Sequence, residues 1–232
     1  MTKNGAILPA LAVGLLFLEM LPMARPADKD GKKSAALPGV LDEAALMKMK
    51  ETAQRTLPKV RQSLHQEEAP GAGALSLGQP LPSTWVGLND LLNQAPGGGE
   101  PVSLLHGSGE SVRFPVIQND SVVSSISCGK WHGEWKTTAY GDSAYTKLLT
   151  TVRKNNADAE GVPVTAYFTV TVTAPRRDYL AFYKDNKLFM VPIMDDPVTG
   201  FKAAQSIPAG EVFSQLRKIA EEQADQLKAA PG

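Results

Sequence analysis

The sequence predicts an α+β protein with a mainly antiparallel sheet of five to seven strands and helices on one face of that sheet. Three observations lead to this fold class. Short apolar segments are joined by tight-turn pairs such as Asn119-Asp120 and Asp185-Asn186, which favours hairpins. Residues 164–174 alternate between apolar positions and Thr or Tyr, as strands do. Segments with helical spacing precede, separate and follow these strands.

The composition excludes several classes of protein. The chain has 232 residues, with 24 Lys and Arg against 24 Asp and Glu, so its formal net charge is zero. This balance argues against a nucleic-acid partner, because such proteins carry an excess of basic residues. The single cysteine excludes a disulfide within the chain and a metal site built from cysteines alone.

The N-terminus has the pattern of a secretory signal. Lys3 precedes an apolar run over residues 6–18, and we interpret residues 1–27 as a signal peptide that is removed. The alternative is a retained anchor, in which case residues 6–24 are the only membrane contact. We therefore expect an exported protein, periplasmic or extracellular. Residues 28–40, rich in Lys and Asp, are expected to form a flexible tether.

Residues 41–65 are predicted to form a helical segment. Asp42 is a suitable N-cap, and one face carries Leu46, Met49, Ala53 and Leu57. Pro58 is expected to break or kink this helix, because proline lacks the amide donor and disfavours helix at the residue before it. The segment is either packed on the main domain or is a helix that binds a partner. The Gly- and Pro-rich residues 66–82 are predicted to be a linker.

The remaining residues, 83–228, are predicted to form the α+β domain. Ser83 as an N-cap starts a short amphipathic helix, and Asp142 and Pro208 start the two later helices. In the hairpin closed by Asp185-Asn186, a two-residue turn places Phe182 opposite Phe189 and Tyr183 opposite Leu188. The expected strands cover residues 102–105, 112–117, 122–128, 134–140, 164–174, 178–184 and 187–194.

Two sets of residues are candidates for binding. The first is the polar face of strand 164–174 together with the hairpin, whose second face is also apolar; its members are Thr165, Tyr167, Thr169, Thr171, Tyr179, Tyr183 and Met190. The alternative is that this hairpin lies in the middle of the sheet beneath helices. The second set is Trp131 and Trp135, which flank a turn and either form a stacking platform for a sugar or peptide or cap the edge of the core.

Catalytic patterns are weak in this sequence. Cys128 is the only thiol, and His132 follows it four residues later, so these two are the only catalytic candidates, for a cysteine hydrolase. The alternatives for Cys128 are burial in the core or pairing with another chain. The sequence has no serine nucleophile elbow, no spacing of metal ligands and no phosphate-binding loop, and we predict neither a metal nor a cofactor.

These observations together predict a non-catalytic exported protein of the cell envelope that binds a protein or a peptide. The alternative is a small-ligand sensor or carrier with a pocket between the sheet and its helices. The cysteine hydrolase is the remote alternative.

Overall fold

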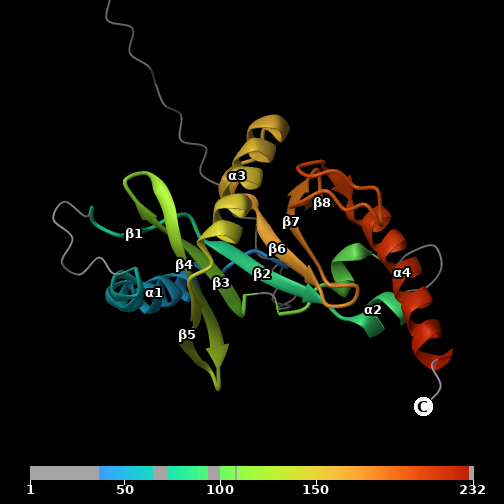
Figure 1. Ribbon diagram of the computed structural model, residues 1–232, viewed down its shortest axis with the longest axis horizontal. Helices are drawn as coiled ribbons and strands as arrows, with labels where there is room; N and C mark the ends of the chain where they lie inside the picture. The colour runs from blue at the N-terminus through green and yellow to red at the C-terminus, as the bar shows by residue number, and fades with distance from the viewer. Residues whose placement is uncertain (1–36, 65–72, 94–99, 108, 230–232) are drawn as a thin grey trace, which may run out of the picture. The chain divides into compact units, whose positions relative to one another are not determined.

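The computed structural model describes residues 37–64, 73–93, 100–107 and 109–229, which belong to one structural unit (Figure 1). The predicted signal peptide, most of the predicted tether and residues 66–72 of the predicted linker lie outside the described residues. The helices are α1 (Glu43–Ser63), α2 (Leu88–Asn93), α3 (Ser143–Glu160) and α4 (Ala209–Ala229), with two 3-10 turns at Pro101–Leu104 and Val164–Ala166. The strands are β1 (Ser76–Leu77), β2 (Leu81–Val86), β3 (Ser111–Gln118), β4 (Ser121–Trp131), β5 (Glu134–Tyr140), β6 (Phe168–Val172), β7 (Arg177–Lys184), β8 (Lys187–Pro192) and β9 (Ile207–Pro208).

The described strands form one sheet of nine in the order β5-β4-β3-β2-β6-β7-β8-β9, with β1 paired to β3. Every pair is antiparallel except β2 with β6, which is parallel. The prediction of a mixed fold with a mainly antiparallel sheet is confirmed. The predicted number of strands is too low, because β2 comes from a segment that we assigned to linker and helix, and because β1 and β9 have only two residues each.

The helices cover both faces of the sheet, so the prediction of helices on one face is wrong. On β7, Ala181 belongs to the core beneath α2 and α4, whereas its neighbours Leu180 and Phe182 belong to the core beneath α3. Successive side chains of a strand point to opposite faces, so these cores lie on opposite sides of the sheet. The register of Pro82 with Val112 places the core under α1 on the same face as α2 and α4. Three helices therefore cover one face and α3 covers the other.

The hairpin predictions are confirmed. Phe182 pairs with Phe189 and Tyr183 with Leu188, joined by Asp185 and Asn186. Both turn residues have positive φ, 52° and 59°, as a two-residue turn that matches the twist of the strands requires. Both faces of this hairpin are apolar because helices cover both of them.

Three other segments differ from the predictions. Residues 76–82, assigned to the linker, provide β1 and the start of β2, and Ser83 lies inside β2 and not at a helix start. Both edges of β2 are paired, and the β-branched and aromatic residues of its second half suit a strand better than a helix. Residues 101–104 form a 3-10 turn and not a strand. Strand β6 begins only at Phe168, because Val164–Ala166 form a 3-10 turn before it.

Helix α1 continues through Pro58, so the break expected there is absent. Asp42 caps the helix by accepting a hydrogen bond from the amide of Ala44 (3.2 Å). Met49, Ala53 and Val60 are fully buried against β3 and β4, and Val60 lies beyond the proline. Burial on both sides of Pro58 offsets the hydrogen bond that this residue cannot donate.

Candidate functional site

The predicted binding face of tyrosines and Met190 is part of the core. Tyr167, Tyr179 and Met190 are buried, and Tyr183 is half-buried and stacks on Phe168. Tyr167 donates a hydrogen bond to Asn156 of α3 (2.8 Å). Burial raises the pKa of Tyr183 to about 12. Tyr167, Tyr179 and Met190 therefore offer no surface to a partner, and Tyr183 offers only part of its side chain, which corrects the assignment of this set as one binding face.

The threonines of the predicted binding set are also engaged within the fold, and Thr169 and Thr171 lie on the sheet face opposite to Tyr179 and Met190. Thr169 is buried between strands and donates to the carbonyl of Pro82 (3.2 Å). Thr171 donates to the carboxylate of Asp178 on the neighbouring strand (2.7 Å). Thr165 is exposed, but it lies in the 3-10 turn and not in the strand. The expected threonine ladder is therefore not an open surface.

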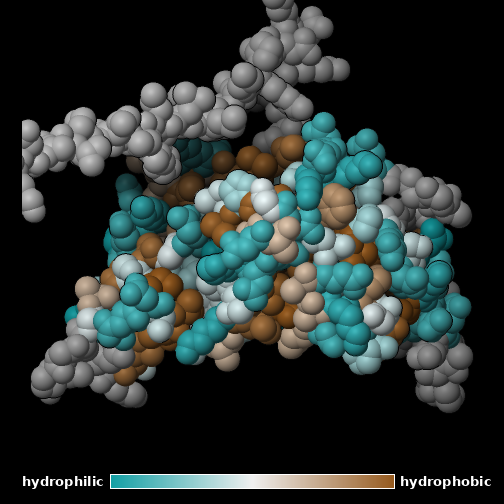
Figure 2. Space-filling view, turned by 90° about the horizontal axis from the view of Figure 1, so that it is seen from above, coloured by the Kyte–Doolittle hydropathy of each residue, from teal (hydrophilic) through white to brown (hydrophobic). Residues whose placement is uncertain are grey.

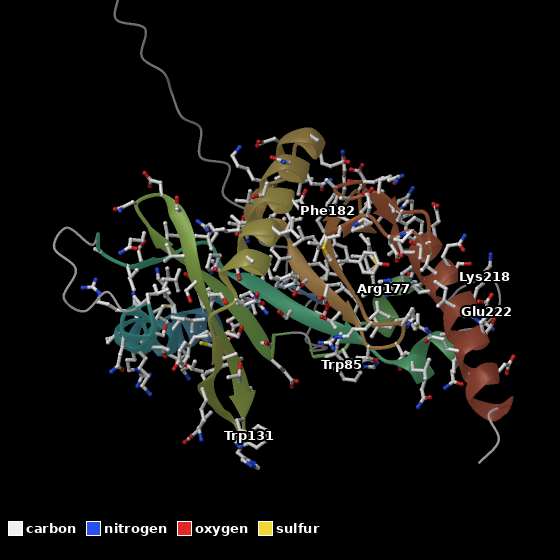
Figure 3. All side chains as sticks on the ribbon, viewed as in Figure 1. Trp85, Trp131, Arg177, Phe182, Lys218 and Glu222 are labelled. Atoms are coloured by element: carbon white, nitrogen blue, oxygen red, sulfur yellow. The ribbon has the colours of Figure 1, made fainter. Side chains whose placement is uncertain are left out.

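Trp131 and Trp135 do not share one platform. Trp135 pairs with Lys130, so it shares the face of Lys130, whereas Trp131 is the next residue of the strand and points to the other face. Trp131 is 62% exposed at the tip of the β4–β5 hairpin, with its ring edge against His132 (Figure 3). Trp135 is half-buried against the core under α1.

Cys128 and His132 do not form a catalytic pair. The Cys128 thiol is fully buried and points toward the carbonyl of Met49 in α1 (Sγ to O, 3.7 Å). Burial raises the pKa of this thiol to about 11, although Thr137 acts in the opposite direction. His132 lies on the exposed turn of the hairpin, with φ of 49°. A protonated thiol inside the core is not a nucleophile, so the geometry contradicts this candidate pair.

Two further pairs of charged or polar side chains lie apart from each other. Arg177 binds Asp196 (2.7 Å), and His106 lies 3.0 Å from Asp90 beneath the ring of Trp85. Burial acts to raise the pKa of Asp196, but the hydrogen bonds from Arg177 and from the Val198 amide outweigh it and hold the pKa below its usual range. Within the described ranges, no three His, Cys, Asp or Glu side chains are grouped closely enough to hold a metal ion.

The arrangement that sequence reasoning missed is a hollow between α1 and β5, which we call the α1–β5 groove. It has a volume of about 570 Å³. Its lining residues are Thr52, Arg55, Thr56 and Lys59 of α1 and residues 135–140 of β5. The four α1 positions follow helical spacing, so they form one stripe on the side of α1 that faces β5. Thr56 and Thr137 are hydrogen-bonded through their hydroxyls (2.7 Å) and hold the two walls together.

One wall of the α1–β5 groove is formed by β5, an edge strand among the described strands. Register places Trp135, Thr137 and Tyr140 on the face that α1 covers, with one extra residue of β5 at a bulge between Thr137 and Ala139. All six residues from 135 to 140 nevertheless line the groove, including those whose side chains point away from α1. Residues from both faces of β5 therefore contribute to the lining. Among the described strands, β5 pairs only with β4 and is an edge strand.

The charges around the α1–β5 groove are of one sign. Arg55, Lys59 and Lys136 line it, and no lining residue is a carboxylate. Lys136 pairs with Glu134 (3.3 Å), whose side chain is 75% exposed and outside the lining. Arg55 donates only to the backbone carbonyl of Glu51 among the described residues (3.4 Å). Two cations of α1 therefore face the groove without a described carboxylate partner.

The basic character of the α1 wall of this groove is visible in the sequence. Arg55, Lys59 and Arg61 are the only charged residues between Thr52 and Leu64, so this end of the helix is basic. What the sequence lacks is the position of α1 against β5, which depends on contacts between residues about 80 positions apart, such as Thr56 and Thr137.

A second hollow of about 690 Å³ lies beside the start of α1. It is mainly apolar, with Lys50 as its one charged lining residue. Its apolar lining residues include Leu41, Leu46, Leu77, Pro80 and Phe114.

No helix in the described part of the chain combines the length and the hydrophobicity that a membrane span needs. Comparison with models of protein families, with curated proteins and with solved structures finds no match to this chain.

Proposed function

We propose that this protein is a non-catalytic binding module that takes up an extended segment of a protein or peptide along the free edge of β5. The observation that carries the proposal is that six consecutive residues of β5, an edge strand among the described strands, line the α1–β5 groove. We also propose that it acts in the cell envelope, on the basis of the signal-like residues 1–27.

The physical basis is strand addition. An edge strand presents backbone N–H and C=O groups that have no partner in the sheet, and an extended segment supplies the complementary groups. Six residues of β5 line the groove, which corresponds to an edge of about 20 Å. Helix α1 forms a wall beside that edge and contacts the side chains of an added strand.

Amide hydrogen exchange on the full chain tests this proposal. Peptides selected against the protein from a library of extended sequences are added, and exchange is followed residue by residue. We expect slower exchange at residues 134–140 of β5, while the β7–β8 hairpin is unchanged. Trp131→Ala, at the exposed hairpin tip, is the control variant that leaves the edge intact. Selected peptides that bind without protecting β5 would exclude the proposed edge.

A small-ligand carrier is the second candidate function, supported by the hollow beside the start of α1. Its volume of about 690 Å³ is in the range of small-molecule sites, and its wall is mainly apolar. Leu46→Trp fills this hollow and should abolish any rise in melting temperature that a metabolite screen detects. If the parent protein shows no rise with any compound, this candidate function is rejected.

A further inference from the structure

We propose that the segment bound in the α1–β5 groove is acidic, with carboxylate side chains at alternate positions, and that it belongs to another protein. This inference rests on the proposed function, because it identifies the chemistry of the segment that adds to β5.

The first argument is charge complementarity. The chain as a whole is balanced, with 24 positive and 24 negative residues, but the α1–β5 groove is lined by three cations and no carboxylate. The wall of α1 contributes Arg55 and Lys59, which make no ion pair among the described residues. Lys48, one helical turn before Thr52, extends the same basic stripe. An acidic segment provides the opposite charge for this wall.

The second argument concerns which positions of the segment are acidic. A strand added to β5 continues the sheet, so its side chains alternate between the two faces. Only every second side chain faces α1, and these side chains meet Arg55 and Lys59. Side chains on the opposite face lie on the side of Lys136, which already has Glu134 as a partner. The structure therefore favours carboxylates at every second residue, on the α1 side, over a continuous acidic run.

The third argument concerns the two ends of the groove. Trp135 and Tyr140 lie at the ends of the lining stretch and both face α1. Tyr140 is 48% exposed and Trp135 is half-buried. Apolar or aromatic residues of the bound segment that flank its acidic positions would pack on these rings.

The test measures binding of synthetic peptides to the full chain. The probe is an alternating Thr-Glu peptide of about eight residues, long enough for the six-residue edge. Alternating Thr-Gln and Thr-Lys peptides of the same length are the controls for charge. Affinity is measured by fluorescence anisotropy between about 50 and 300 mM salt, because screening weakens interactions between exposed charges. Exchange of the β5 amides is measured in parallel.

Two variants with the same change in net charge separate the groove from the rest of the surface. Arg55→Gln with Lys59→Gln removes both positive charges that α1 contributes to the groove lining. Lys187→Gln with Lys218→Gln is the matched control, because both lysines are exposed, Lys187 on β8 and Lys218 on α4 (Figure 3). Figure 2 shows that hydrophilic side chains cover the end of the molecule where α4 lies. We expect the affinity for the Thr-Glu peptide to fall about two- to fivefold for each groove cation removed, and the control variant to bind as the parent does.

The outcomes distinguish this inference from the proposed function. Tight binding of the Thr-Glu peptide that weakens with salt and depends on Arg55 and Lys59 supports both. If the Thr-Gln peptide binds equally well and still protects β5, the edge function stands and the acidic segment is rejected. If no peptide protects β5, both are rejected. If the chain pairs with a second copy of itself through β5, seen as a dimer by light scattering, the inference of another protein as partner is overturned.

Discussion

Substitution of Phe182 by Ala tests the central feature of the fold, the second core beneath α3. Phe182, labelled in Figure 3, is fully buried. The centroid of its ring lies 4.9 Å from that of Tyr167 and 5.6 Å from that of Phe189. Burial of about 200 Å² of aromatic surface at about 25 cal/mol per Å² is worth about 5 kcal/mol. Alanine keeps part of this contact, so we expect the free energy of unfolding to fall by about 4 kcal/mol.

The assay is urea unfolding followed by circular dichroism. With a slope of about 2 kcal/mol per M, the midpoint should fall by about 2 M at an unchanged slope. Phe182→Leu keeps an apolar side chain but loses both ring contacts, and should cost about 1 to 2 kcal/mol. Val198→Ala, at a position that is 63% exposed, is the control and should change stability by less than about 0.5 kcal/mol. A loss below about 1 kcal/mol for Phe182→Ala would refute the second core.

Cys128, Gly39 and Asp196 each lead to one further prediction. Cys128, whose pKa is raised to about 11, should react with iodoacetamide at neutral pH more than about 100-fold more slowly than in the unfolded chain; rapid native labelling contradicts its burial. Gly39 has φ of 83° and the ring of Phe168 occupies the place of a Cβ, so Gly39→Ala should lower the free energy of unfolding by about 2 kcal/mol, measured by urea titration; an unchanged midpoint contradicts this packing. The folded pKa of Asp196 lies below its unfolded value of 3.8, so its pairing with Arg177 stabilises the fold above that pH and is lost as the pH falls through the folded pKa. Asp196→Asn should cost about 1 to 3 kcal/mol at pH 7 and flatten the acid side of the stability profile, and an equally steep acid limb in the variant contradicts the role of this pair.

Local features of the fold could be predicted from the sequence. The turn at Asp185-Asn186 and the register of Phe182 with Phe189 depend on neighbouring residues alone, because a two-residue turn fixes which residues are opposite. The same holds for β5, where the predicted range 134–140 matches the observed bounds. Asp42 as the cap of α1 was likewise visible in the sequence.

Pairing over long distances could not be predicted. Ser83, Trp85 and Leu88 have the spacing of a short helix, but residues 81–86 form a strand because β3 and β6 pair with both of its edges. The position of α1 against β5 is a contact of the same kind. Without knowledge of this packing, Arg55 and Lys59 are only part of a basic helix face. The sequence then offers no reason to choose them as binding residues in place of the tyrosines, which the structure places in the core.

The parallel pairing of β2 with β6 has a consequence for the order of assembly. Ser83 meets Thr169, which lies 86 residues later in the chain. As the chain leaves the ribosome, β3, β4 and β5 can pair as soon as each is made, because only short turns separate them in the sequence. One edge of β2, in contrast, has no partner until β6 has been made. During that interval the growing chain carries a second unpaired strand edge besides that of β5, and a chaperone that binds extended segments would find its target there.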